Sequence, residues 1–349
     1  MAFRDGKIGC AVVGYGPTFN FGGMHCKWIE AVEDMRLLAI CDRDPERAAL
    51  ARSEWPETVD VSQDLDEVLA RDDIDMVSVV TAHNTHARLV IKCLEAGKHT
   101  IVDKPMCITI PEATTMIEAS HRAGKSLGIF HNRRHDGNVR AIKEAIEQGL
   151  LGQVFDIELS ATGYWHPGGD AWRLRKEVSG GLMYDWGSHA IDWVLSMVPS
   201  QMAEITGFFY KLMWPEVTNE DQTQAIIRFE NGTCAKITQS TLDYAGKPLW
   251  RILGTEGAIV DGGGGAIDGY CKEVSGPSGG TFTLINSEGR KEMPYKESDW
   301  VTHYRDVADH LLRGAKMPVS GEDGRRVITV LQTAERSSKE GRSLVPEYK

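Results

Sequence analysis

Three polar side chains at helical spacing are the first candidates for chemistry. Asp185, His189 and Asp192 follow Gly180 and Gly181 at intervals of four and three residues. An α-helix would place all three on one face, with an imidazole between two carboxylates. An unperturbed imidazole has a pKa of about 6.5, which suits a general base near neutral pH. The same spacing is also typical of a polar stripe that faces water.

A glycine-rich turn near the N-terminus favours the catalytic interpretation, because it predicts a dinucleotide cofactor. An apolar run over residues 7–13 ends at Gly14 and Gly16, and Gly22 precedes a helical pattern over 24–32. Gly14 permits a tight turn, Gly16 lets the backbone approach a pyrophosphate, and the helix start offers N–H groups to the anion. The loop is three residues longer than the strict GxGxxG pattern, so the motif is weak by itself.

An acid in the expected place strengthens the prediction. The second apolar strand, 35–41, ends at Asp42, twenty residues after Gly22. An acid there accepts hydrogen bonds from the adenosine ribose and favours NAD. The neighbouring Arg43 leaves NADP as the alternative, because a guanidinium can stack on adenine or pair with a 2′-phosphate. Capping of the helix that begins near Pro45 is a second interpretation of Asp42, but it explains neither the spacing nor the glycine loop.

Strands and helices alternate up to residue 130, which predicts an α/β fold with a doubly wound parallel sheet. We expect further strands over 76–80, 100–102 and 127–130, and helices over 65–70, 86–96 and 111–123. Ligands of such sheets bind beyond the carboxyl ends of the strands.

Two strand ends carry polar residues at that edge. Lys104 follows one strand directly, where a surface lysine is unusual, and we expect it at the nicotinamide end of the cofactor. Asn84, after the preceding strand, is a candidate for the cofactor ribose, with His83 beside it. His86 fits the start of the following helix equally well as a cap.

The pattern changes after residue 134. A helix over 138–148 leads to an alternating strand over 154–159, and two later runs, 224–229 and 233–241, flank Asn231-Gly232, a strong hairpin signal. This predicts an α+β domain with an antiparallel sheet, followed by helices over 301–312 and 322–338. We expect loops in the glycine-rich stretches 262–265 and 275–280.

A segment of aromatic and basic residues in this second part is a candidate for substrate binding. Tyr164 and Trp172 offer rings that can stack on the apolar face of a sugar, and Arg173 can hold hydroxyls or a carboxylate through paired N–H groups. An ordinary surface loop is the alternative interpretation. Proton donation is a second interpretation of Tyr164.

Composition excludes several classes of partner. The 349 residues carry a formal net charge of -11, which argues against nucleic acid and anionic membranes as partners. No apolar run reaches the roughly 20 residues that span a bilayer, and the first residues lack the pattern of a signal peptide. Scattered cysteines without a CxxC spacing favour free thiols in the cytoplasm over disulfides or zinc sites: Cys10, Cys26, Cys41, Cys93, Cys107, Cys234 and Cys271.

As a set, these motifs resemble the glucose-fructose oxidoreductase / inositol dehydrogenase family (Gfo/Idh/MocA). The resemblance runs from about Lys7 to Val345. Three departures are an expanded glycine loop, Asp103 in place of the family's glutamate, and His83 where a proline is common. The pieces that match, in order, are Gly22-Gly23-Met24-His25, Asp42, Gly97-Lys98-His99, Asp103-Lys104-Pro105, Asn132-Arg133-Arg134, Trp172-Arg173, the stretch from Gly180 to Asp192, and Gly254-Thr255-Glu256-Gly257.

The resemblance implies a Rossmann domain, expected over 1–132, and a substrate-binding domain with a large open, mostly antiparallel sheet, expected over 133–349. It also implies NAD(P) as cofactor and catalytic roles for Lys104, Asp185 and His189. In the manner of this family, we expect one face of the second sheet to meet another subunit, in a homodimer or homotetramer.

These observations predict a dehydrogenase that acts on a secondary hydroxyl of a sugar, glycoside or cyclitol. His189 would take the hydroxyl proton, Lys104 would stabilise the developing alkoxide, and Asp185 would orient the imidazole or bind a neighbouring hydroxyl. We expect Asp192 to hold its helix in place. A metal bound by the two carboxylates and the imidazole is a further interpretation, but we expect none because the dinucleotide supplies the redox agent.

Two other functions are consistent with the same residues. The first is an NAD-using glycosidase or lyase that oxidises its sugar transiently, which would need the same lysine and histidine. The second is a non-catalytic NAD-binding regulator, against which the complete set of predicted catalytic residues argues.

Overall fold

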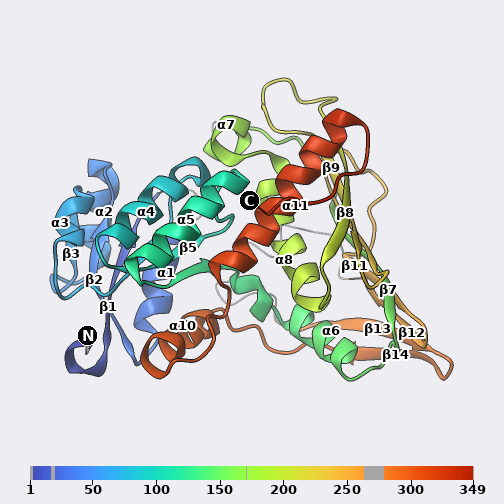
Figure 1. Cartoon of the computed structure of the whole chain (residues 1–349), viewed down its shortest axis with the longest axis horizontal. Coiled ribbons are helices and arrows are strands. Elements are labelled where there is room, and N and C mark those ends of the chain that lie inside the picture. The colour runs from blue at the N-terminus through green and yellow to red at the C-terminus, as the bar shows by residue number, and fades with distance from the viewer. Residues whose placement is uncertain (1–2, 17–19, 170, 263–278, 349) are drawn as a thin grey trace. The chain divides into compact units, whose positions relative to one another are not determined.

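The computed structural model describes residues 3–16, 20–169, 171–262 and 279–348 (Figure 1). The chain forms two compact units. The first comprises residues 1–107, 111–131 and 301–325, and the second comprises 108–110, 132–300 and 326–349. The sequence-based boundary at 132 falls beside the observed one at 131. The later segment Val301–Arg325, which we expected in the second domain, belongs to the first unit.

The first unit contains a six-stranded parallel sheet in the order β3-β2-β1-β4-β5-β6, which confirms the predicted doubly wound fold. The reversal of order beside β1 is the switch point at which such sheets bind their ligands. Strands β1, β4 and β5 are buried along their length apart from one residue, His99. The strands are β1 (Ile8–Val13), β2 (Met35–Cys41), β3 (Asp60–Ser62), β4 (Met76–Val79), β5 (His99–Asp103) and β6 (Leu127–Phe130).

Helices alternate with these strands, as the sequence predicts. The first begins three residues earlier than expected, at Phe21, directly after the glycine loop. The helices are α1 (Phe21–Glu30), α2 (Pro45–Glu54), α3 (Leu65–Leu69), α4 (His86–Glu95), α5 (Ile110–Ala123) and α10 (Val301–Arg313), with short 3₁₀ turns at Arg4–Gly6 and His83–Thr85.

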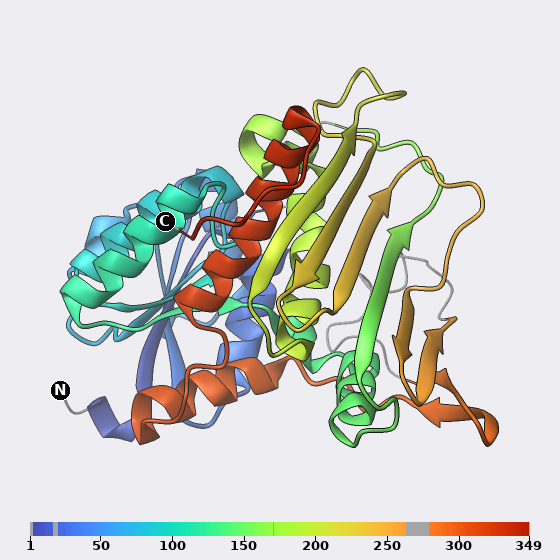
Figure 2. The same cartoon turned by 45° about the vertical axis from the view of Figure 1, so that its right-hand side comes forward.

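The second unit contains an eight-stranded sheet in the order β14-β13-β12-β11-β7-β10-β9-β8 (Figure 2). All neighbours are antiparallel except β7 and β10, which run parallel. The predicted hairpin is β9 and β10, and the mostly antiparallel sheet is confirmed. The strands are β7 (Val154–Thr162), β8 (Met202–Tyr210), β9 (Gln222–Phe229), β10 (Cys234–Ser240), β11 (Trp250–Gly254), β12 (Gly257–Asp261), β13 (Thr281–Asn286) and β14 (Gly289–Pro294).

One face of this sheet consists of buried apolar side chains such as Ile157, Ile237 and Ile252. The opposite face carries charged side chains, among them Glu158 and Lys236. The helical segments of the unit are Asn132–His135 (3₁₀), α6 (Gly137–Glu147), Trp172–Leu174 (3₁₀), α7 (Lys176–Ser179), a π-helix over Met183–Gly187, and α8 (Ser188–Met197). The final helix, α11 (Gly321–Glu340), begins in the first unit and continues in the second.

We expected loops in the stretches 262–265 and 275–280, of which residues 263–265 and 275–278 lie outside the described residues. Among the helices that the structure describes, none combines the length and the hydropathy that a bilayer span requires.

Candidate cofactor and substrate sites

The glycine loop of the first unit has room only for glycine at two of its three predicted positions. Gly14 has a φ of 105°, and a Cβ there would lie 2.0 Å from the backbone oxygen of Val80. A Cβ on Gly22 would lie 2.1 Å from the oxygen of Gly14. A Cβ on Gly16, by contrast, would meet no described atom within 4 Å. Gly14 and Gly22 therefore form the turn, while Gly16 presents open backbone of the kind that a pyrophosphate can approach.

Asp42 holds this turn through its carboxylate. Its oxygens accept hydrogen bonds from the backbone N–H of Tyr15 at 2.6 Å and of Asp44 at 3.0 Å. The cap of α2 is Asp44, which accepts from Glu46 N at 2.9 Å. The capping role considered for Asp42 is therefore wrong. Asp42 instead links the end of β2 to the glycine loop, and the Arg43 side chain beside it is exposed.

Tyr15, inside the glycine loop, was not predicted from its sequence position. Its side chain is buried, and its hydroxyl donates to Glu54 at 2.5 Å and accepts from Trp55 Nε1 at 3.0 Å. Burial raises the pKa of Tyr15, and the bond to Glu54 adds to the effect. The phenol therefore remains a donor at neutral pH and ties the loop to the end of α2.

A buried imidazole joins the segments that follow β4 and β5. The ring of His86 lies with Nδ1 2.9 Å from Pro105 O and Nε2 3.0 Å from Thr81 O. Carbonyl oxygens only accept, so both contacts are hydrogen bonds together only when the ring carries two protons. His86 stands at the start of α4, but its side chain connects the segment after β4 with the segment after β5. Asn84 lies in the 3₁₀ turn between them and is exposed.

Lys104 is buried at the tip of β5. Lys104 is only 8% exposed, which excludes the interpretation as an ordinary surface lysine. The peptide bond to Pro105 is cis, and the backbone N–H of Lys104 donates to Asp103 Oδ1 at 2.9 Å. A buried lysine at the carboxyl edge of a parallel sheet is where a cofactor or substrate would meet an ammonium group.

In the second unit, the predicted catalytic stretch is not one regular α-helix. Met183–Gly187 is a π-helix, and α8 begins only at Ser188. Asp185 therefore lies in the π-helical turn, whereas His189 and Asp192 lie in α8. The spacing of 3.6 residues per turn applies between His189 and Asp192, which both lie in α8. It does not apply between Asp185 and His189, because the π-helix gives way to the α-helix between them. π-helical turns are often found at functional sites.

Each of the two acids in this stretch is paired with an arginine. Arg173 Nη1 donates to Asp185 Oδ1 at 3.2 Å. Arg134 donates to the buried carboxylate of Asp192 through two bonds, Nε to Oδ2 at 2.8 Å and Nη2 to Oδ1 at 2.6 Å. Asp192 thus anchors α8 to the turn after residue 132, as its predicted scaffolding role requires, and the sequence gives no spacing that would identify its partner.

His189 is buried in an aromatic environment. Its ring lies 6.0 Å from that of Trp186 in an edge-on geometry and 6.5 Å from that of Trp193 in a stacked one. The Trp193 indole donates to Arg133 O at 3.0 Å, which fixes the position of this ring beside His189. Aromatic packing of this kind limits the orientations that the imidazole can take.

Arg173, one of the predicted substrate-binding residues, contacts both an aromatic ring and an acid. Its guanidinium lies over the ring of Trp172 at 4.5 Å, in addition to its bond with Asp185. Its backbone oxygen accepts from Asn219 Nδ2 at 2.7 Å. Tyr164 lies in a different part of the same unit, within an aromatic cluster with Trp214 and Tyr244.

Glu220 and Lys176 support the entrance to the π-helix, and no sequence motif identified them. Glu220 Oε2 accepts from Leu182 N at 3.1 Å, directly after the left-handed glycines Gly180 and Gly181. Lys176 pairs with both Glu220 and Glu335. Burial by itself would lower the pKa of Lys176, but the hydrogen bonds to these two carboxylates raise it.

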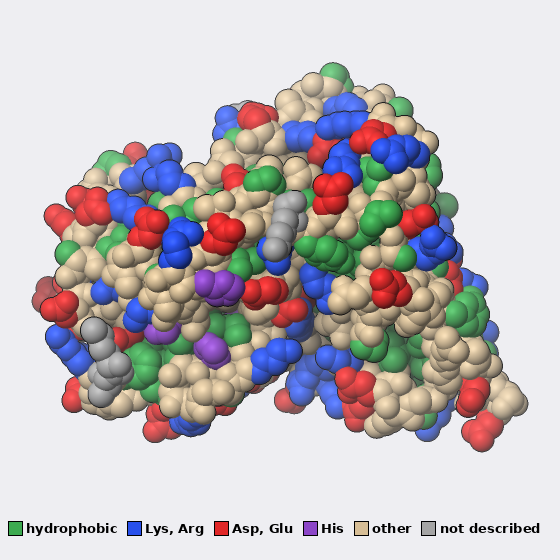
Figure 3. Space-filling view, viewed as in Figure 1, with side chains coloured by type: hydrophobic (Ala, Val, Ile, Leu, Met, Phe, Trp, Pro, Cys, Tyr) green, Lys and Arg blue, Asp and Glu red, His purple; other side chains and the backbone are tan. Residues whose placement is uncertain are grey.

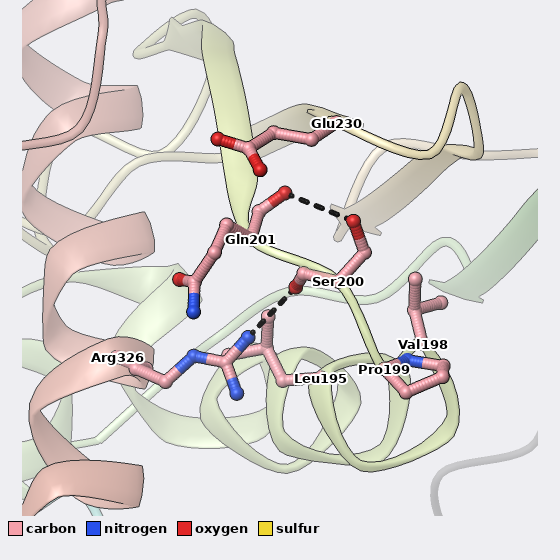
Figure 4. A pocket seen from close by; sticks show the side chains of 7 residues that line it. All are labelled: Leu195, Val198, Pro199, Ser200, Gln201, Glu230 and Arg326. Atoms are coloured by element: carbon pink, nitrogen blue, oxygen red, sulfur yellow. Dashed lines mark hydrogen bonds between the residues drawn. The ribbon is translucent and has the colours of Figure 1, made fainter.

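A cavity of about 410 Å³ lies elsewhere in the second unit, beside α8, α11 and the segment that joins α8 to β8 (Figure 4). Arg326 Nη2 donates there to Ser200 O at 3.3 Å. None of the predicted site residues lines it. The lining residues are Leu195, Val198, Pro199, Ser200, Gln201, Glu230 and Arg326.

The described residues contain no group of three His, Cys, Asp or Glu side chains placed to hold a metal ion. On the face seen in Figure 3, basic and acidic side chains are interspersed over both units. The six cysteines in the described part of the chain are free thiols.

Comparison with known proteins identifies the class. Residues 8–131 match the oxidoreductase family with an NAD-binding Rossmann fold, and residues 139–260 match the GFO/IDH/MocA C-terminal domain. The chain belongs to the Gfo/Idh/MocA family of NAD(P)-dependent oxidoreductases, as the sequence motifs predicted.

Several named proteins are similar over nearly the whole chain. One is scyllo-inositol 2-dehydrogenase (NADP(+)) IolW of Bacillus subtilis, 26% identical over 98% of this chain and 96% of its own length. Myo-inositol 2-dehydrogenase of Thermotoga maritima is 26% identical over 95% and 97%. The aldose-aldose oxidoreductase of Caulobacter crescentus shares the fold, with a TM-score of 0.82 at 21% identity over 97% and 98% of the two chains.

Proposed function

We propose that this enzyme oxidises a secondary hydroxyl of a sugar, glycoside or cyclitol, with NAD as the preferred cofactor. The observation that carries the proposal is the buried His189, which follows a π-helical Asp185 whose carboxylate is bound by Arg173. An acid and a base in one segment, with a guanidinium bound to the acid, suit a polyhydroxylated substrate, because its adjacent hydroxyls each need a donor or an acceptor. The relatives named for inositol substrates support the same class.

The glycine loop fits a dinucleotide, since two of its positions exclude any Cβ and the third leaves the backbone open. We assign Gly14, Gly16, Gly22, Asp42, Arg43, Asn84 and Lys104 to cofactor binding. Asp42 carries the preference for NAD, and Arg43 leaves NADP as the alternative. The bound nicotinamide supplies the hydride acceptor.

In the proposed reaction, the H–C–O–H unit of the substrate becomes a ketone. The hydroxyl proton passes to a ring nitrogen of His189, and hydride leaves the same carbon. Lys104 donates a hydrogen bond to the oxygen and stabilises the negative charge that develops there. Arg173 and Asp185 bind neighbouring hydroxyls and Trp172 is an apolar contact for this ring, whereas Tyr164 contacts a more distant part of the substrate.

A screen with sugars, sugar acids, inositols and glycosides tests the proposal, with NADH or NADPH formation measured by absorbance. For a substrate found in this way, we expect His189→Ala and Lys104→Met each to lower kcat by about 10²- to 10⁴-fold while NAD still binds. His121→Ala is the control, because the His121 side chain is 71% exposed on α5. A kcat for His189→Ala within a few-fold of the unaltered enzyme would refute the role of His189.

The same screen separates the other two functions. Release of aglycone from a glycoside without net NADH would identify a redox-assisted glycosidase or lyase. No turnover of any compound by a protein that binds NAD would favour a regulator.

We also propose that the enzyme is a homodimer or homotetramer whose subunits meet through the charged face of the eight-stranded sheet. On that face, Lys236 pairs with Asp156 at 3.0 Å and Arg251 pairs with Glu158 at 3.2 Å. Light scattering should give the mass of two or four chains, and a double variant Lys236→Glu with Arg251→Glu should shift it toward one. An unchanged mass in the double variant would place the contact elsewhere.

A further inference from the structure

Three loops of the second unit leave the same end of the sheet. Strands β7, β8 and β10 run in the same direction, because β7 and β10 are parallel and β9 is antiparallel to both β8 and β10. The segments after them, 163–169, 211–221 and 241–249, are therefore neighbours (Figure 2).

Backbone hydrogen bonds join the first and third of these loops. Asp243 N donates to Gly163 O at 2.9 Å and Trp165 N donates to Thr241 O at 3.1 Å, and an isolated β-bridge pairs Tyr164 with Leu242.

Four ring-bearing side chains gather on these loops, and we call them the aromatic platform: Tyr164, His166, Trp214 and Tyr244. The rings of Tyr164 and Tyr244 are stacked, with centroids 3.8 Å apart and an interplanar angle of 18°. Trp214 lies 6.0 Å from Tyr164 and 4.7 Å from His166. The set thus brings three aromatic rings and one imidazole together, although each ring comes from a loop.

The platform is exposed and yet fixed. Tyr244 is 80% exposed and Tyr164 38%, so these rings are not part of the core. The Trp214 indole donates to Thr241 Oγ1 at 3.0 Å, and the Asp243 carboxylate accepts from Ala245 N at 2.9 Å and Gly246 N at 3.0 Å. Rigid aromatic rings lose little conformational entropy on binding, so an exposed set held in this way is suited to contact a ligand.

The rim of the platform is polar. His166 Nε2 forms a hydrogen bond with Glu216, and the hydrogen bond that the Tyr244 hydroxyl donates to Tyr164 raises the pKa of Tyr244. A pyranose ring has an apolar face of C–H groups and a rim of hydroxyls. The platform matches both parts, because its rings can stack on the face while the Glu216 and His166 groups bond to the rim. A purely apolar partner would make no use of the further hydrogen bonds that these polar groups can form.

One loop connects the platform to the residues that we assign to substrate binding. Trp214 and Glu216 lie in the first half of loop 211–221. In its second half, Thr218 N donates to Leu174 O at 3.1 Å and Asn219 Nδ2 donates to Arg173 O at 2.7 Å. The loop that carries part of the platform thus also fixes the backbone of Arg173, whose guanidinium binds Asp185.

We propose that the aromatic platform is a subsite for a second pyranose ring, so that the substrate is a disaccharide or a glycoside with a sugar as aglycone. The inference rests on the proposed function for the ring that is oxidised. Tyr244 offers its exposed face to the second ring, and Glu216 accepts hydrogen bonds from that ring's hydroxyls.

Kinetics with one-ring and two-ring substrates test the subsite. We expect Tyr244→Ala to raise KM for cellobiose or maltose about 3- to 10-fold, which corresponds to the loss of one stacking contact, and to leave kcat and the KM for methyl glucosides unchanged. Tyr244→Phe should behave as the unaltered enzyme, because it keeps the stacking ring. Tyr210→Ala is the matched control: it removes an exposed tyrosine of β8 that lies outside the platform.

Direct binding keeps the test independent of turnover. Cellobiose and maltose are titrated into the NAD-loaded protein, with tryptophan fluorescence as the signal, for the unaltered enzyme and for Tyr244→Ala. We expect the variant to bind the disaccharide 3- to 10-fold more weakly. If no sugar is oxidised but this difference is found, the proposed function fails and the subsite stands. If neither disaccharide binds, if Tyr244→Ala binds both as before, or if the variant instead loses subunit contacts by light scattering, the subsite is refuted.

Discussion

The two units fix their candidate site residues in different ways. In the first, the strand-end segments are held mainly by backbone groups: Asp42 accepts from Tyr15 N, and the His86 ring spans the carbonyls of Thr81 and Pro105. In the second, they are held by pairs of charged side chains, Arg173 with Asp185 and Arg134 with Asp192. A site fixed by backbone should tolerate few changes of shape. A site fixed by ion pairs should respond to the removal of charge.

The glycine loop offers the largest expected effect. Gly14→Ala would place a Cβ 2.0 Å from Val80 O at a φ of 105°, so the turn must open. We expect a loss of about 3 kcal/mol or more in the free energy of unfolding, together with loss of NAD binding. Denaturant unfolding and a fluorescence titration with NADH measure the two quantities.

Gly16→Ala is the matched control for this prediction. A Cβ there meets no described atom within 4 Å, so stability should change by less than about 0.5 kcal/mol. NAD binding should nevertheless weaken, because the methyl group would occupy the space that a pyrophosphate needs. Equal stability losses in the two variants would show that the loop is not fixed by its backbone.

Acid should weaken the first unit through His25. Burial lowers the pKa of His25 to about 4, while its Nδ1 lies 2.7 Å from the hydroxyl of Tyr304, which also contacts Ser78 Oγ at 2.8 Å. The neutral ring is favoured in the folded state and the unfolded chain takes up the proton near pH 6.5. The contribution to stability is therefore complete above pH 6.5 and is lost as the pH falls toward 4, at up to about 1.4 kcal/mol per pH unit.

His25→Gln isolates this effect, since the amide can still accept from Tyr304. We expect the variant to be less stable at pH 7.5 but to show a shallower loss of stability between pH 6.5 and 4, as measured by hydrogen exchange of the β1 and α1 amides. The same slope in both proteins would assign the acid sensitivity to other groups, such as His99, whose pKa is likewise lowered to about 4 mainly by burial.

Two acids of one segment test the ion pairs of the second unit. Asp192 is buried and accepts two bonds from Arg134, whereas the Asp185 side chain is 35% exposed and accepts one from Arg173. We expect Asp192→Ala to cost about 2–3 kcal/mol of stability with a modest loss of kcat, because Arg134 loses its partner. Asp185→Ala should cost less than about 1 kcal/mol but lower kcat/KM at least tenfold. Thermal unfolding and kinetics on a substrate from the screen separate the two, and the reverse order of effects would exchange their roles.

The difference between the units also explains what the sequence could predict. Strands of the first unit follow from local apolar runs, and β2 was expected at its observed bounds, Met35–Cys41. The parallel pairing of β7 with β10 could not be predicted, because it joins strands about 80 residues apart. The π-helix over Met183–Gly187 was missed because a change of hydrogen-bond register leaves no trace in the spacing of residue types.

The candidate sites divide in the same way. Gly14, Asp42 and Lys104 were predictable because each follows a strand, and position in a doubly wound sheet gives their place. The partner of Asp192 was not, since Arg134 lies 58 residues earlier in the chain. Tyr244 and Trp214 carried no signal at all, because the exposed loops that bring them together have no periodicity.

The smallest expected effect concerns Asp42, where backbone support and ligand binding meet in one carboxylate. It accepts from two backbone N–H groups in the structure, and in the proposed function it also accepts from the adenosine ribose. Asp42→Asn keeps the shape but replaces one acceptor oxygen by a donor, so one N–H contact is lost and the repulsion of a 2′-phosphate disappears. We expect a stability loss of about 1 kcal/mol and a fall of about tenfold in the ratio of the NADP dissociation constant to the NAD dissociation constant.

Fluorescence titrations with NADH and NADPH measure this ratio. Arg43→Ala is the opposing control, since it should weaken NADPH binding alone. An unchanged ratio in Asp42→Asn would restrict this carboxylate to its backbone contacts and leave the choice of cofactor to other residues.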